Sequence, residues 1–173
     1  MLVFGHVATA TVLCHGLDRK ADLRFVVFYT LVADIVDKPL GLLVFRETIN
    51  NGRVWFHSLA VNLLVSLLLV LARKPGVYVL ALWLHQLCDR MWMRPWVALW
   101  PLTGAFSYRD LPIEDWVYSL FGPYNVMSDV VGLVVLVAFA RYYGLFDRKR
   151  VWVWLQRGEL TRADRACPPS PPG

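Results

Sequence analysis

Cysteine is scarce in this sequence, and the N-terminus carries no marker of secretion. The three cysteines, at positions 14, 88 and 167, are widely separated, and none belongs to a Cys-x-x-Cys pair. A disulfide framework is therefore not expected. The N-terminus lacks the positively charged segment that begins a signal peptide, and His6 interrupts its apolar run, so we expect the first helix to be retained.

The sequence also lacks a single concentrated patch of charge. The formal net charge is +5, but the Lys and Arg residues occur in short groups between apolar runs. This distribution is typical of membrane topology signals. Nucleic acid is therefore not expected as a partner.

Apolar and aromatic residues are abundant instead. Hydrophobic residues make up 57% of the 173 residues, with eight Trp and seven Tyr, whereas soluble domains contain roughly 45–50% apolar residues. The length suggests one domain, and long uncharged runs suggest helices that cross a lipid bilayer. The sequence thus predicts an all-α fold, a polytopic membrane helix bundle.

About five transmembrane helices are expected, at residues 2–17, 23–45, 55–72, 77–93 and 125–146. Residues 94–124 are rich in Trp and Pro and should lie along the membrane surface. Residues 1–146 would then form the membrane-embedded helical domain that carries the site. Residues 147–173 would form a basic C-terminal tail, disordered in part because of its PPSPPG ending.

His85 and Asp89 are four residues apart in an apolar stretch that we expect to be helical. Four residues is just over one helical turn, so both side chains leave the same face. Ionisable groups in such apolar sequence usually have a function or a partner. The pair either shares a metal ion or is a buried histidine satisfied by a carboxylate.

Asp34 and Asp37 form a second pair on one helical face, just before Pro39, which should end or kink the helix. Two carboxylates so close repel each other unless a cation lies between them or one is protonated. Lys38 could neutralise them, but its position on the helix should direct it elsewhere. This second pair therefore also indicates a cation site.

The basic groups orient the helices in the cell membrane. Clusters at residues 19–24, 73–74 and 148–150 follow the first, third and fifth helices and indicate the cytoplasmic side. His15 falls at this end and is not expected in the site. Six other residues fall at one depth in the non-cytoplasmic half of the membrane: His6, Asp34, Asp37, His57, His85 and Asp89.

Imidazoles and carboxylates together suit a divalent metal, with Zn²⁺ or Mn²⁺ expected first and Fe²⁺ also suitable. Ca²⁺ would prefer oxygen ligands alone. The six residues could hold one ion with spare groups, or two ions. A polar network without metal is the alternative.

The order of the motifs resembles that of a known family. Five motifs occur over residues 5–101: Gly5-His6, Ala33-Asp34-x-x-Asp37, Arg53-x-x-x-His57-Ser58-Leu59, His85-x-x-x-Asp89 and Leu99-Trp100-Pro101. Together they resemble the membrane-bound metal-dependent hydrolase family of the LexA-regulated type. The chain departs from the family pattern at Lys38, where many members have His, and at Gly52, where the family's third motif begins with His.

Two functions are compatible with these features. The first is an integral-membrane hydrolase whose metal-activated water attacks a phosphoester or lipid-type substrate. Asp37 would be a ligand or the general base, and Arg53 would hold a substrate phosphate. The second is a non-catalytic multi-pass membrane protein, with a transport or structural role, that uses the same cluster as a metal or polar network; the few crossings and the lack of an inverted repeat disfavour transport.

Overall fold

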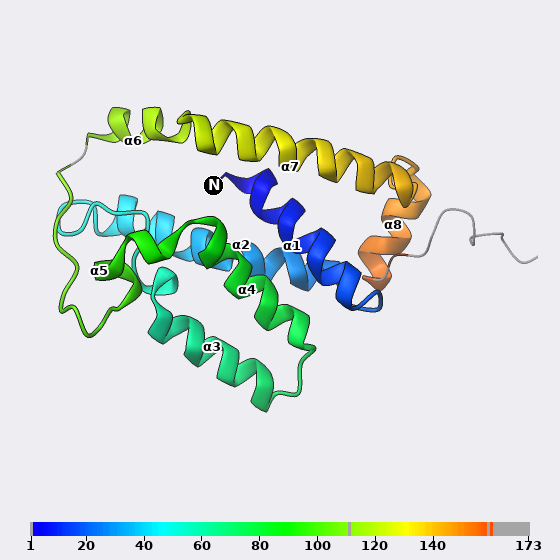
Figure 1. The fold of residues 1–173 in the computed structure, drawn as a ribbon, viewed down its shortest axis with the longest axis horizontal. Helices are drawn as coiled ribbons and strands as arrows, with labels where there is room; N and C mark the ends of the chain where they lie inside the picture. The colour runs from blue at the N-terminus through cyan, green and yellow to red at the C-terminus, as the bar shows by residue number, and fades with distance from the viewer. Residues whose placement is uncertain (1, 111, 159, 161–173) are drawn as a thin grey trace, which may run out of the picture.

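Helices are the regular elements of the described residues, 2–110, 112–158 and 160, of the computed structural model, and these residues contain no strand (Figure 1). The all-α prediction is therefore confirmed. The structure contains α1 (Val3–Leu17), α2 (Leu23–Pro39), the π-helical turn η1 (Leu40–Val44), the 3-10 turn η2 (Trp55–His57), α3 (Leu59–Leu71), α4 (Gly76–Cys88), the 3-10 turn η3 (Met91–Met93), α5 (Pro95–Ala98), α6 (Ile113–Leu120), α7 (Pro123–Tyr142) and α8 (Arg148–Arg157).

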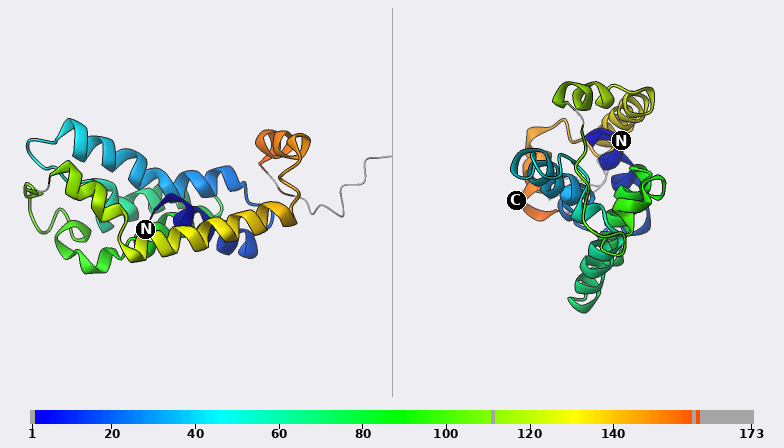
Figure 2. Two further views of the ribbon diagram at one scale, coloured as in Figure 1. Left: turned by 90° about the horizontal axis from the view of Figure 1, so that it is seen from above. Right: turned by 90° about the vertical axis from the view of Figure 1, so that its left-hand side faces the viewer.

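Helix α1 lies at the centre of the bundle and packs against α2, α4 and α7, whereas α3 leans away from the rest (Figures 1 and 2). The inner face of α1 is made of small residues. Ala10 on this face is fully buried, together with Val26 of α2 and Ala81 of α4. The contact with α7 is closer still, because a Cβ on Gly132 would lie 2.6 Å from the backbone of Gly5. Small residues thus bring four helices close to one axis.

Helix α2 continues through Pro39 and then opens into the π-helical turn η1. Proline cannot donate the backbone hydrogen bond of a regular α-helix, so a change of helix type beside it is expected. Gly41 in this turn is required by a close approach, since a Cβ there would lie 1.8 Å from the carbonyl oxygen of Asn51. This contact positions the loop that leads to Arg53 and η2.

The fourth helix ends earlier than the sequence predicted. Helix α4 stops at Cys88, and Arg90 adopts a left-handed conformation with φ of 54° before η3 begins. An L-residue in this conformation cannot continue a right-handed helix. Asp89 and Arg90 therefore stand at the end of α4 rather than on its side.

The third predicted helix is divided, and part of the predicted tail is helical. Ser58 accepts a hydrogen bond from the backbone N–H of Val61 (3.3 Å) and begins α3, so His57 belongs to η2 before the helix. Asp147 caps α8 by accepting from the N–H of Lys149 (2.9 Å). The predicted disorder of the C-terminal end falls on residues 161–173, which lie outside the described residues.

Among the described residues, α7 alone is long and apolar enough to cross a bilayer, with 20 residues and a mean hydropathy of 1.7. Helices α1, α3 and α4 are apolar but have 15, 13 and 13 residues, whereas a span usually needs about 20. The structure therefore has one helix of membrane-spanning length among the described residues, not the five or so that the sequence predicted. The interruptions at Ser58 and Arg90 explain part of the difference, because each divides a predicted span.

Candidate metal centre

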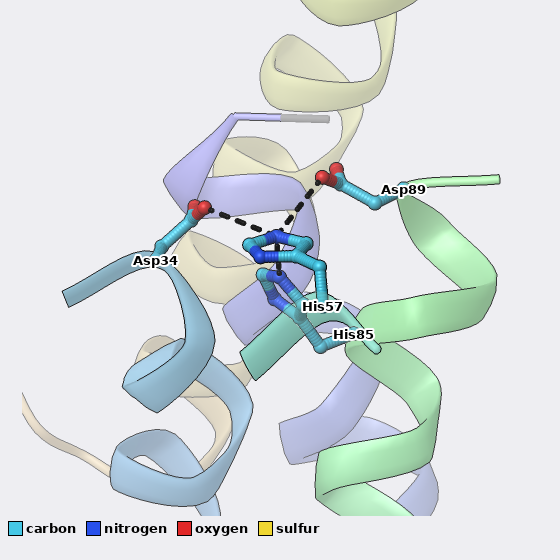
Figure 3. Close-up of side chains that lie close together, drawn as sticks. All are labelled: Asp34, His57, His85 and Asp89. Atoms are coloured by element: carbon cyan, nitrogen blue, oxygen red, sulfur yellow. Dashed lines mark hydrogen bonds and ion pairs between the residues drawn. The ribbon is translucent and has the colours of Figure 1, made fainter. Parts of the chain in front are cut away.

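Four buried side chains from separate elements of the bundle converge on one another (Figure 3). Asp34 comes from α2, His57 from η2, and His85 and Asp89 from the end of α4. Each offers one ligand atom, and these atoms all lie within 4.8 Å of one another. The fold thus brings Asp34 and His57, from two segments distant in sequence, next to the His85–Asp89 pair.

Asp37 fixes the ring of His57. Its Oδ2 accepts hydrogen bonds from Nδ1 of His57 (2.7 Å) and from the backbone N–H groups of His57 (3.1 Å) and Val54 (2.9 Å), and its Oδ1 accepts from the N–H of Phe56 (3.1 Å). A carboxylate only accepts, so the proton of a neutral His57 ring is on Nδ1 and Nε2 carries a lone pair. Carboxylates orient metal-ligating histidines in this way.

The separations around Nε2 of His57 fit a metal ion. This atom lies 3.2 Å from Nε2 of His85, 3.6 Å from Oδ2 of Asp89 and 3.7 Å from Oδ1 of Asp34. Ligand atoms about 2.0–2.1 Å from a tetrahedral metal ion lie about 3.3–3.4 Å apart. Among the described residues Oδ1 of Asp34 has no hydrogen-bond partner although it is buried, which is costly for an acceptor. A cation among the four side chains would satisfy this oxygen.

Two cationic side chains, Lys38 and Arg53, form ion pairs with the carboxylates of the cluster. Nζ of Lys38 donates to Oδ2 of Asp34 (2.7 Å), and Nε of Arg53 donates to Oδ2 of Asp89 (2.5 Å). Lys38 and Asp34 are four residues apart on α2, a spacing that places side chains together, so the expectation that Lys38 points elsewhere was wrong. Burial opposes the charge of Arg53, but Asp89 outweighs it and raises the pKa of Arg53 above its ordinary value.

His6 lies beside the four residues rather than among them. Its ring stacks on His85, with the ring centroids 4.3 Å apart, and its Nε2 lies 3.2 Å from Oδ1 of Asp89. Its Nδ1 is buried and has no hydrogen-bond partner in the part of the chain that the structure describes. His6 therefore supports two of the four residues from one side.

The structure thus brings four of the six predicted ligands together and places the other two around them. Four hydrogen bonds occupy the carboxylate of Asp37, which favours a positioning role over the predicted role of ligand or general base. His15 lies away from the group, as predicted, and its Nε2 is 2.8 Å from the hydroxyl of Tyr143.

A cavity of about 520 Å³ opens beside Asp89, the one residue of the four that lines it. Arg94 lies in the wall of this cavity, and burial together with the charges of Arg53 and Arg109 lowers its pKa. The sequence indicated Arg53 alone as a substrate-binding residue, because the other arginines of the lining lie in irregular segments that show no periodic pattern. The described lining contains five cationic side chains and one carboxylate: Lys38, Arg53, Arg90, Arg94, Arg109 and Asp89.

The fold and the site define a helical protein with a buried histidine–aspartate cluster that is able to hold a divalent cation. No protein-family model, curated protein or solved structure matches this chain. The function therefore has to be inferred from the chemistry of the cluster and its cavity.

Proposed function

We propose that this protein is an integral-membrane metal-dependent hydrolase that acts on a phosphoester or lipid-type substrate. The observation that carries the proposal is the convergence of four buried ligand atoms within 4.8 Å of one another, beside a cavity with a cationic lining. Two imidazoles and two carboxylates suit Zn²⁺ or Mn²⁺. The motif resemblance to the membrane-bound metal-dependent hydrolase family agrees with this choice.

Exposed apolar surface supports the membrane part of the proposal. Only 6% of the apolar window of α7 is buried, so this helix differs from the core helix of a soluble protein. Contiguous apolar surface of this kind is rare on soluble monomers and is typical of membrane or partner contacts. Residues of α7 and α3 with exposed fractions of 40% or more include Val126, Met127, Val130, Val131, Val134, Leu63, Leu64, Leu67, Leu68, Val70 and Leu71.

The orientation proposed is the one that the basic residues indicate. The site lies at the start of α1 and the end of α4. The basic clusters at residues 19–24, 73–74 and 148–150 follow the ends of α1, α3 and α7. Because positive clusters mark the cytoplasmic side, the site belongs to the non-cytoplasmic half of the cell membrane.

Each residue of the site has a defined role in this proposal. Asp34, His57, His85 and Asp89 would hold the metal, which when bound supplies Lewis acidity and lowers the pKa of a water molecule. Asp37 keeps the lone pair of His57 directed to the centre. Arg53 contacts Asp89 and lines the cavity, where its planar guanidinium suits a phosphate group.

Metal content and hydrolysis, measured side by side on purified protein, test the proposal. We expect the wild type to bind a stoichiometric divalent metal and to hydrolyse members of a phosphoester and lipid panel. His85→Ala should lose both properties, whereas His15→Ala, a matched removal of a buried histidine outside the site, should keep the metal. A wild type without metal after reconstitution with Zn²⁺ and Mn²⁺ would refute the proposal.

A second candidate is a non-catalytic membrane protein in which the cluster is structural. The observation in its favour is that Lys38 and Arg53 already pair with Asp34 and Asp89. Such pairs reduce the need for a metal, since each carboxylate has a cation beside it. Bound metal without turnover of any substrate in the panel, or stable folding without metal, would favour this candidate.

A further inference from the structure

The charge of the cavity exceeds what the cluster itself requires. Lys38 and Arg53 are paired with Asp34 and Asp89. The ion pairs of the described residues give Arg90, Arg94 and Arg109 no carboxylate partner, although all three line the cavity. Three arginines held around one cavity repel one another, so their arrangement favours a ligand with several negative charges.

Arg90 is held in place before any ligand arrives. Its backbone has a φ of 54°, a left-handed conformation that L-residues other than Gly, Asn and Asp rarely adopt. Its guanidinium carbon lies 3.6 Å from the ring centroid of Tyr124, and the hydroxyl of Tyr124 donates to the carbonyl oxygen of Cys88 (2.9 Å). An arginine stacked on an aromatic ring keeps its N–H edge available for an oxyanion.

Arg109 is tied to the same wall by its backbone. Its N–H donates to the carbonyl oxygen of Ile49 (3.0 Å), and its carbonyl oxygen accepts from Nδ2 of Asn50 (2.9 Å). Arg94 lies between η3 and α5 and is half-buried. Segments far apart in the sequence are thus fastened so that their arginines surround one space.

We propose that the cavity binds the diphosphate group of a substrate. One phosphate carries a charge of about −1.5 to −2 near neutral pH, which the combined positive charge of the three arginines exceeds. Two linked phosphates bring more charge and more acceptor oxygens, and arginine pairs with such oxygens in a bidentate manner. The inference rests on the proposed function only for the bond that is hydrolysed; the binding of the diphosphate depends on the arginines.

The test is equilibrium binding of inorganic pyrophosphate and inorganic phosphate to the full-length protein in detergent. We expect pyrophosphate to bind more tightly than phosphate. Arg94→Gln and Arg109→Gln should each weaken pyrophosphate binding by about tenfold or more, the loss of a charge-assisted hydrogen bond. Arg46→Gln removes the same charge from an exposed loop position that does not line the cavity, and it should leave binding unchanged.

Arg90→Lys provides a second variant that keeps the charge but loses the planar group. It should lower the preference for pyrophosphate over phosphate while leaving the metal content intact. Equal affinity for the two anions in the wild type would overturn the inference, and so would equal pyrophosphate affinity in Arg94→Gln, Arg109→Gln and Arg46→Gln.

The source of the diphosphate is identified by a competition experiment. Vesicles that contain a lipid with a diphosphate headgroup compete with soluble pyrophosphate for the wild type, and vesicles with a neutral headgroup serve as the control. Displacement by the diphosphate vesicles supports the inference with a lipid source; binding of soluble pyrophosphate alone supports it with a soluble source. Diphosphate binding without hydrolysis would refute only the proposed function, whereas phosphoester hydrolysis unchanged in Arg94→Gln and Arg109→Gln would refute only this inference.

Discussion

The replacement Asp37→Asn tests whether Asp37 orients the ring of His57 for metal binding. Oδ2 of Asp37 accepts three hydrogen bonds, including the one from Nδ1 of His57, and Oδ1 accepts one from the N–H of Phe56. An asparagine has one acceptor oxygen, and its best orientation keeps that oxygen in the place of Oδ2. The N–H of Phe56 then faces the amide NH₂ group, and the negative charge beside His57 is lost.

Two magnitudes follow from this geometry. Leaving the half-buried N–H of Phe56 unsatisfied should lower the free energy of unfolding by about 1 kcal/mol. Loss of the carboxylate that orients a metal-ligating histidine should weaken metal binding by about 10–100-fold. Asp37→Asn should therefore fold and bind Zn²⁺, but with lower affinity than the wild type.

The assay is competition for Zn²⁺ with a chromogenic chelator, together with the midpoint of thermal unfolding. Thr30→Val is the matched control, because Thr30 is buried on the same helix and its hydroxyl donates to the carbonyl oxygen of Val26 (2.8 Å), away from the cluster. It should change stability without changing metal affinity. Wild-type metal affinity in Asp37→Asn would refute the positioning role, and if hydrolysis were lost as well, Asp37 would be the proton acceptor.

Three further outcomes are expected. Asp89→Asn should lose metal more completely than Asp37→Asn, because Asp89 belongs to the set of four and also holds Arg53; inductively coupled plasma analysis of both proteins measures this, and equal retention would contradict it. Zn²⁺ at about 100 times its dissociation constant should stabilise the wild type by about 2.7 kcal/mol, and a similar stabilisation of the His85→Ala variant would place the metal elsewhere. Gly132→Leu should destabilise the α1–α7 contact by about 1–3 kcal/mol through overpacking, because even a Cβ at this position would lie 2.6 Å from the backbone of α1. Gly16→Ala is the control and should be tolerated, because no atom lies within 4 Å of the added Cβ. Equal thermal midpoints for the two variants would contradict this prediction.

Sequence alone predicted the main apolar helices and the His85–Asp89 pair, because both depend on local periodicity. The spacing of His85 and Asp89 brings their side chains to one centre even though α4 ends at Cys88. The apolar runs at α1, α3 and α7 were likewise placed within a few residues of their observed ends. Helical periodicity relates residues less than two turns apart, so these conclusions needed no knowledge of the tertiary fold.

Only the tertiary structure decided which of two neighbouring aspartates faces the centre. Asp34 and Asp37 look equivalent in sequence, but the loop before η2 reaches Asp37 and occupies its oxygens with backbone N–H groups. The same holds for the cationic cavity, whose arginines come from irregular segments at residues 53, 90, 94 and 109. The course of such segments depends on contacts between distant parts of the chain, here the approach of Asn51 to Gly41 and the hydrogen bond from Arg109 to Ile49. Local residue patterns carry no information about these contacts, so the partners of the cluster appear only when the helices are packed together.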